Sequence, residues 1–140
     1  MMENYSEEYI TSRLGVKRPV LLIENAEIEE QTLIGKMYLK DDLFFWDAHF
    51  EGNPTMPGTY MLEMLAQSGA FLDMELAKAE TVPIITSITN VRFLREVKPN
   101  QEITSEVKIK VINGAFYTTT GKVICQGKTV CKAELVHVVK

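Results

Sequence analysis

One apolar segment near the middle of the chain constrains the fold more than any other feature. Residues 58–78 read GTYMLEMLAQSGAFLDMELAK, a run of strong helix formers without proline. At roughly 100° per residue, its Met, Leu, Ala and Phe side chains point in nearly every direction around a helix. A helix that is apolar on all sides is a buried one. We therefore expect a long buried helix that reaches water only at Asp73, Glu75 and Lys78.

Strand patterns flank this helix on both sides. Residues 18–40 carry β-branched and aliphatic residues around a polar break at 29–31, which predicts two strands joined by a turn. After Pro83, the turn signals KPN, NGA and QGK separate four β-rich runs. These runs are 84–94, 101–112, 116–125 and 128–139. In the second run, Val107 and Ile109 alternate with charged residues, as in an antiparallel strand with one buried face.

The order of the elements predicts the architecture. A short helix is expected at 5–14 and a structured loop, rich in aromatics, Gly and Pro, at 41–56. A buried helix flanked only by strands needs a curved sheet around it, because no other layer is present. The pattern thus predicts an α+β hotdog fold. The 140 residues, without repeats or linkers, are expected to form a single domain, 1–140.

Composition narrows the classes of function. The net charge of −4 argues against a nucleic-acid binder, which neutralises phosphates with a basic surface. No apolar run reaches the roughly 18 residues of a membrane span, and the start MMENYSEEYI is too acidic for a secretory signal. We therefore expect a cytoplasmic protein without membrane insertion. Cys125 and Cys131 are expected to be buried thiols, and no spacing of Cys and His predicts a metal site.

A lone acid inside the predicted helix is the first candidate for chemistry. Glu63 stands among Met, Leu and Ala, and Gln67 lies four residues on, on the same helix face. An ionised carboxylate is costly to bury, so an apolar setting favours the protonated form, which is a suitable general acid. Alternatively, Glu63 lies on a solvated stripe, or is satisfied by Gln67 or a backbone donor.

The two histidines differ in their surroundings. His49 lies in the predicted loop just before the helix, and histidine titrates in the range of a general base. A structural histidine in a turn is the alternative. His137 continues the alternation of Cys131, Ala133 and Leu135 toward Val139 on an apolar strand face, which predicts a core or edge histidine.

The helix start offers a third group. Backbone N–H groups in a first helical turn have no intrahelical acceptor, and the helix dipole adds positive potential there. The N–H of Gly58, unobstructed by a side chain, could receive a developing oxyanion. A base, an acid and an oxyanion donor thus occur within a short stretch of sequence, although nearness in sequence does not bring them together in space.

These residues resemble a known family signature. HFEGNPTMPG at 49–58, followed by LEMLAQ at 62–67, is similar to the motif of FabZ-type 3-hydroxyacyl-[acyl-carrier-protein] dehydratases. The segments RPVLLIE and VRFLREVKPNQEI resemble the family's first strand and the strand after its helix, so the similarity runs from about residue 18 onward.

The resemblance implies a mechanism. His49 would remove the C2 proton of a 3-hydroxyacyl thioester, and the N–H of Gly58 would stabilise the enolate-like oxygen. Glu63 from a partner subunit would protonate the leaving C3 hydroxyl, with Gln67 orienting it. The product is the trans-2-enoyl thioester, as in fatty-acid or related polyketide and polyene synthesis. The resemblance implies no metal or redox cofactor, and at least a homodimer. Glu rather than Asp at position 63 resembles FabZ rather than the isomerising FabA enzymes.

The sequence departs from the family pattern beside the histidine. Ala48 stands where the family usually has Gly, Glu51 replaces a Pro, and Trp46 replaces a Phe. Ala48 removes some backbone freedom, whereas Glu51 adds a charge and loosens φ; the predicted base and acid are kept and the pathway is left open.

The acyl carrier protein that the resemblance implies is acidic, as this chain is. Docking would then need a local basic patch, for which Arg92, Arg95 and Lys98 are the candidates; ordinary solvated charges are the alternative. Two other functions fit the same fold, a thioesterase and a non-catalytic acyl-binding or assembly subunit.

Overall fold

The chain folds as one antiparallel sheet curved around a long helix. The computed structural model describes residues 2–78 and 80–138. Its elements are β1 (Glu3–Ser6), α1 (Glu7–Leu14), β2 (Asn25–Glu29), β3 (Thr32–Leu39), α2 (Gly58–Ala77), β4 (Ile84–Phe93), β5 (Gln101–Asn113), β6 (Phe116–Cys125) and β7 (Lys128–Val138). This is the predicted hotdog fold, with Val139 of the last predicted strand outside the described residues.

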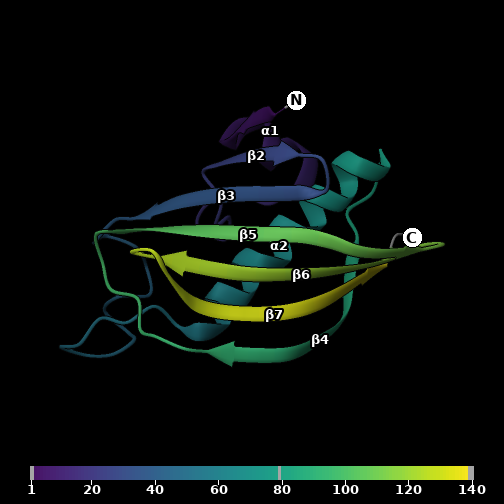
Figure 1. Cartoon of the computed structure of the whole chain (residues 1–140). Coiled ribbons are helices and arrows are strands. Elements are labelled where there is room, and N and C mark those ends of the chain that lie inside the picture. Colours follow the sequence, from purple (N-terminus) through teal and green to yellow (C-terminus); the bar gives the residue numbers. More distant parts are fainter. Residues whose placement is uncertain (1, 79, 139–140) are drawn as a thin grey trace.

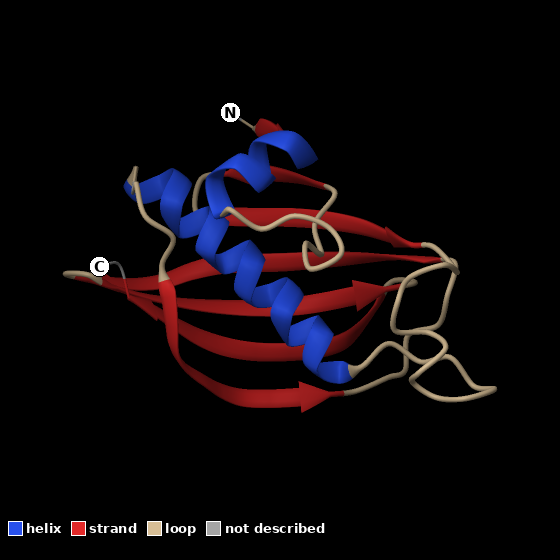
Figure 2. Ribbon diagram, turned by 180° about the vertical axis from the view of Figure 1, so that it is seen from behind, coloured by secondary structure: helices blue, strands red, loops and turns tan. Residues whose placement is uncertain are grey.

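The seven strands lie in the order β1-β2-β3-β5-β6-β7-β4, and each pair of neighbours is antiparallel. Figure 1 shows β4 at one edge of the sheet and β1, with α1 beside it, at the other. Seen from behind, α2 crosses the concave face obliquely, and the long loops gather near its first turn (Figure 2). The start of α2 is thereby placed among the segments that connect the strands.

Helix α2 matches the predicted boundaries. It begins after Pro57, and Lys78 ends it in the left-handed conformation (φ 56°), with its N–H bonded to the carbonyl of Met74. Most of its middle is buried, and Gly121 on β6 lets it approach closely: a Cβ there would lie 3.0 Å from a methyl of Leu65. The helix therefore packs directly on the sheet.

Two sequence predictions at the N-terminal side need correction. Residues 18–23, predicted to begin the first strand, are not in the sheet, and β2 starts only at Asn25. Their backbone bonds elsewhere: the N–H of Leu22 donates to the side chain of Gln67. In addition, Glu3–Ser6 form a strand on β2 that the pattern did not indicate, and Ser6 then caps α1 by accepting from the N–H of Tyr9. The remaining strands and the loop at 41–56 agree with prediction.

The far end of α2 holds a buried ionisable pair. Asp73 was expected to reach water, but its side chain is fully buried, 3.3 Å from Nδ1 of the equally buried His137. His137 is thus in the core, as predicted, and both cysteines are buried free thiols, also as predicted. Burial raises the pKa of Asp73 to about 7 and lowers the pKa of His137 to about 4, so both shifts favour the uncharged forms.

The pair predicts an unusual dependence of stability on pH. The raised pKa of Asp73 adds to the free energy of unfolding. This contribution is complete below the ordinary pKa of 3.8 and is lost as pH rises through about 7. His137 stabilises above its ordinary pKa of 6.5, and this contribution is lost as pH falls through about 4. Between pH 4 and 6.5, the contribution of Asp73 to stability falls with pH while that of His137 rises, so the two oppose each other. For Asp73→Asn we therefore expect stability to rise across this window, by up to about 1.4 kcal/mol per pH unit relative to the parent.

Urea unfolding at a series of pH values measures this difference. His137→Asn should show the opposite slope, a loss of stability from pH 4 to 7, and the double variant should show neither. Parallel pH profiles for the parent and Asp73→Asn would contradict the assignment.

Candidate active site

The loop that carries His49 is closed by its own hydrogen bonds. The N–H of Thr55 donates to the carbonyl of His49 at 2.8 Å, and Phe50 and Asn53 exchange two backbone bonds of 2.9 Å. The N–H of Met56 then donates to the carbonyl of Val97, which ties the loop to the segment after β4. The loop is thus a compact structure held against the body of the fold.

These bonds also fix the state of the His49 ring. Its Nδ1 lies 2.8 Å from the backbone carbonyl oxygen of Thr55. A carbonyl only accepts, so Nδ1 carries the hydrogen in this contact, and Nε2 of the neutral ring keeps a lone pair. The geometry gives His49 the tautomer that a general base requires.

His49 and the start of α2 line the same open cavity, of about 520 Å³. Gly58 lies in its wall, where no side chain caps the helix and no acid occupies the first turn. The ring of Phe93 packs over this glycine, since a Cβ at position 58 would lie 2.9 Å from the ring carbons. The helix start, where N–H groups have no intrahelical acceptor, and the histidine thus border one cavity.

Glu63 and Gln67 are joined to each other but not to this cavity. Gln67 is buried. Its Nε2 donates to Oε2 of Glu63 at 2.8 Å and to the carbonyl of Val20 at 2.9 Å. Its Oε1 accepts from the N–H of Leu22 at 2.8 Å. Glu63 itself is exposed and is not in the wall of the cavity. The expected apolar surroundings of this carboxylate are therefore not present within one chain.

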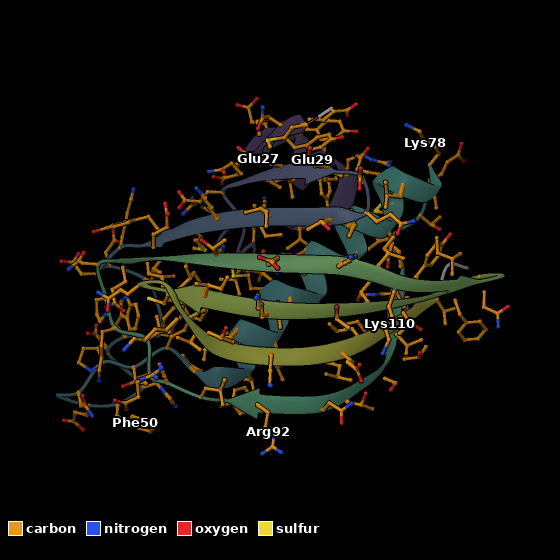
Figure 3. The ribbon with its side chains drawn as sticks, viewed as in Figure 1. Glu27, Glu29, Phe50, Lys78, Arg92 and Lys110 are labelled. Carbon is orange, nitrogen blue, oxygen red and sulfur yellow. The ribbon has the colours of Figure 1, made fainter. Side chains whose placement is uncertain are left out.

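The three cations expected to form a docking patch have different surroundings. Arg92 is on β4, opposite Lys132 of β7, and projects from the edge of the sheet (Figure 3). Arg95 lines the cavity of His49. Lys98 bonds to the side chains of Asn53 and Thr55 in the histidine loop. Arg95 thus lines the cavity, and Lys98 contacts one of its lining residues.

The sequence did not indicate the residues that support the site. Thr55 and Lys98 act through contacts between segments more than 40 positions apart, and 18–23 reach α2 through Gln67. Hydrophobic periodicity carries no information on such polar contacts.

Among residues 2–78 and 80–138, no group of three or more His, Cys, Asp or Glu side chains is arranged to hold a metal ion, and no helix is long and apolar enough to span a membrane.

Solved structures confirm the class of fold. The dehydratase heterocomplex ApeI:P from Xenorhabdus doucetiae superimposes with a TM-score of 0.75 at 14% identity, over 94% of this chain and 90% of that one. The PaaI protein of E. coli gives a TM-score of 0.64 at 12% identity, over 94% and 88%. At such low identity the similarity establishes the hotdog fold alone.

Sequence similarity identifies the family. Residues 17–134 match the family model of the FabA-like domain. A 3-hydroxyacyl-[acyl-carrier-protein] dehydratase FabZ from Clostridium beijerinckii is 36% identical over 123 residues, which cover 84% of this chain and 86% of the relative. The FabZ of Caldicellulosiruptor saccharolyticus is 31% identical over 97% and 99% of the two chains. The chain belongs to the FabA-like family and is of the FabZ type.

The contacts of Gln67 predict a structural cost of its loss. In Gln67→Leu, the N–H of Leu22 loses its acceptor in a buried position, which should destabilise the protein by about 1–3 kcal/mol in urea unfolding. Glu63→Gln is the matched control, since it changes only the exposed partner and should stay within about 0.5 kcal/mol of the parent. Equal stability of the two variants would contradict the role given to Gln67.

Proposed function

We propose that this chain dehydrates 3-hydroxyacyl thioesters, carried on acyl carrier protein, to trans-2-enoyl thioesters. The observation that carries the proposal is the shared cavity of His49 and Gly58, in a chain whose FabZ relatives are named for this reaction. The chemistry requires removal of a proton from C2 and loss of the hydroxyl from C3 as water.

His49 is the proposed base. Its Nε2 lone pair takes the C2 proton, and the electron pair left at C2 is delocalised onto the thioester oxygen. Gly58 lines the same cavity, and its N–H would stabilise the negative charge on that oxygen, aided by the helix dipole. The electron pair then returns to form the C2–C3 double bond as the C3–O bond breaks.

Glu63 is the proposed acid, contributed by a second copy of the chain. It would give its proton to the departing hydroxyl, which leaves as water, and the proton taken by His49 restores the acid through solvent. Within one chain, Glu63 is exposed and apart from the cavity of His49. Burial against a second subunit would favour its protonated form, and Gln67 would hold its carboxylate in place.

Strand β4 is the proposed dimer contact. It lies at the edge of the sheet, with free backbone groups on one side, and edge strands of this kind pair readily with another chain. Its side chains support the pairing, because Ile84, Ile88 and Phe93 are 47%, 36% and 53% exposed. Leu94, just beyond the strand, is 50% exposed. A homodimer would bury these apolar groups near the cavity.

The reaction is tested by following two products at once. Purified protein is incubated with a 3-hydroxyacyl thioester on acyl carrier protein, and enoyl formation and free thiol release are measured together. We expect enoyl product without thiol release. Thiol release without enoyl product would identify a thioesterase instead, and neither product would identify a binding subunit.

The assigned roles predict the effects of two substitutions. His49→Ala and Glu63→Ala should each lower turnover by at least about 10²-fold while the fold is retained, because each removes one proton-transfer group. Mixed dimers of the two variants contain one site with both groups intact, so mixing them after partial dissociation should restore activity. Full activity of either single variant, or no recovery on mixing, would contradict the shared site.

The dimer contact predicts the effect of a charge on β4. Ile88→Lys should yield a folded monomer with little activity, since a lysine at the paired edge blocks association. Light scattering after size exclusion measures the mass, and Ile124→Lys, on an inner strand of the same sheet, is the control expected to remain dimeric. An active monomer would refute the proposed assembly.

A further inference from the structure

Lys98 reaches from the segment after β4 into the histidine loop. Its Nζ donates to Oδ1 of Asn53 and to Oγ1 of Thr55, both at 2.9 Å. The nearest acid, Glu96, lies 3.8 Å away and is 65% exposed, so that ion pair contributes little. The ammonium group is therefore oriented by the neutral oxygens of the loop.

Thr55 connects this lysine to the candidate base. Its side chain accepts from Lys98, its carbonyl accepts from Nδ1 of His49, and its N–H donates to the carbonyl of His49. Thr55 is 7% exposed, so these contacts are partly shielded from water. A shift of Thr55 would therefore move the acceptor that fixes the tautomer of the ring.

Asn53 connects the lysine to the other side of the loop. Its backbone exchanges two hydrogen bonds with Phe50, the residue after His49. Bonds from an ammonium group are stronger than neutral ones, and here two of them hold the two sides of one short loop. The lysine backbone is held in turn, because its N–H donates to Oε1 of Gln101.

The tip of the loop is exposed to solvent. Glu51, Gly52 and Asn53 are all exposed, and Gly52 has a φ of 73°. Since Glu51 leaves φ unrestricted where proline would fix it, the conformation depends on the bonds that close the loop.

We propose that Lys98 is a positioning residue for His49, acting through Thr55 and Asn53, and not a docking residue for the carrier protein. By holding the Thr55 hydroxyl, it fixes the position of the Thr55 carbonyl, which keeps the hydrogen on Nδ1 and directs the lone pair of Nε2 into the cavity. The catalytic consequence rests on the proposed function, in which His49 is the base.

The two roles of Lys98 predict different kinetics. Lys98→Met is assayed on a 3-hydroxyacyl carrier thioester and on the same acyl group carried by N-acetylcysteamine. Positioning predicts a fall in kcat of about 10-fold on both substrates with KM little changed, because the base is displaced. Docking predicts a raised KM on the carrier substrate alone, and that result would overturn the proposal. Lys36→Met, on the outer face of β3, is the control for loss of a surface charge.

A spectroscopic measurement separates positioning from general structural support. The chain has only two histidines, so the ¹⁵N signals of both rings are readily assigned. In Lys98→Met, the His49 ring should populate both tautomers, while His137 in the core stays unchanged. Thr55→Val, in which Lys98 itself is unchanged, should have the same effect on the His49 ring. In the double variant, the tautomer populations should shift no further than in either single variant. Lys98→Arg, which keeps two donors, should largely restore the parent spectrum.

The outcomes distinguish this inference from the proposed function. If His49→Ala is inactive but Lys98→Met keeps the parent kcat and the parent His49 tautomer, only the positioning role fails. If the parent protein forms no enoyl product, the proposed function fails, and the tautomer measurement still decides whether Lys98 orients the ring.

Discussion

Enclosure of α2 by a single curved sheet is the constraint on which the rest of the structure depends. The helix buries residues on nearly all sides, and its close approach to the sheet leaves no space for a Cβ at Gly121 without displacing Leu65. This packing fixes where the helix begins. Gly58, at the start of the helix, lines the cavity of His49, so the burial that stabilises the fold also brings the first turn of α2 and the candidate base to one cavity.

Polar residues inside this helix follow two different rules. Gln67 is buried and uses its amide fully, since it binds the backbone of Val20 and Leu22 and also Glu63. Asp73, six residues further on, lies 3.3 Å from His137, and burial shifts the pKa of both groups toward the neutral forms. The first arrangement supports the site, whereas the second is tolerated because neither group needs to carry charge.

The site itself is divided between rigid parts of one chain and a surface that faces outward. His49 and Gly58 share a cavity, but Glu63 is exposed in the second turn of α2. The same chain also exposes apolar residues on the edge strand β4. A second copy that covers the edge would complete the site and bury the acid in one event, which links assembly to activity.

The sequence by itself determined the helix, the order of the later strands and the motif from His49 to Gln67, because hydrophobic periodicity and turn residues are local properties. It also placed His137 in the core. It misplaced Asp73, missed β1 and extended the first strand into residues 18–23, because neighbours distant in the chain decide those positions. Only the tertiary structure assigned Lys98 to the histidine loop and placed Arg95, but not Arg92, in the wall of the cavity. Those outcomes depend on hydrogen bonds between segments far apart in sequence, and no local pattern encodes them.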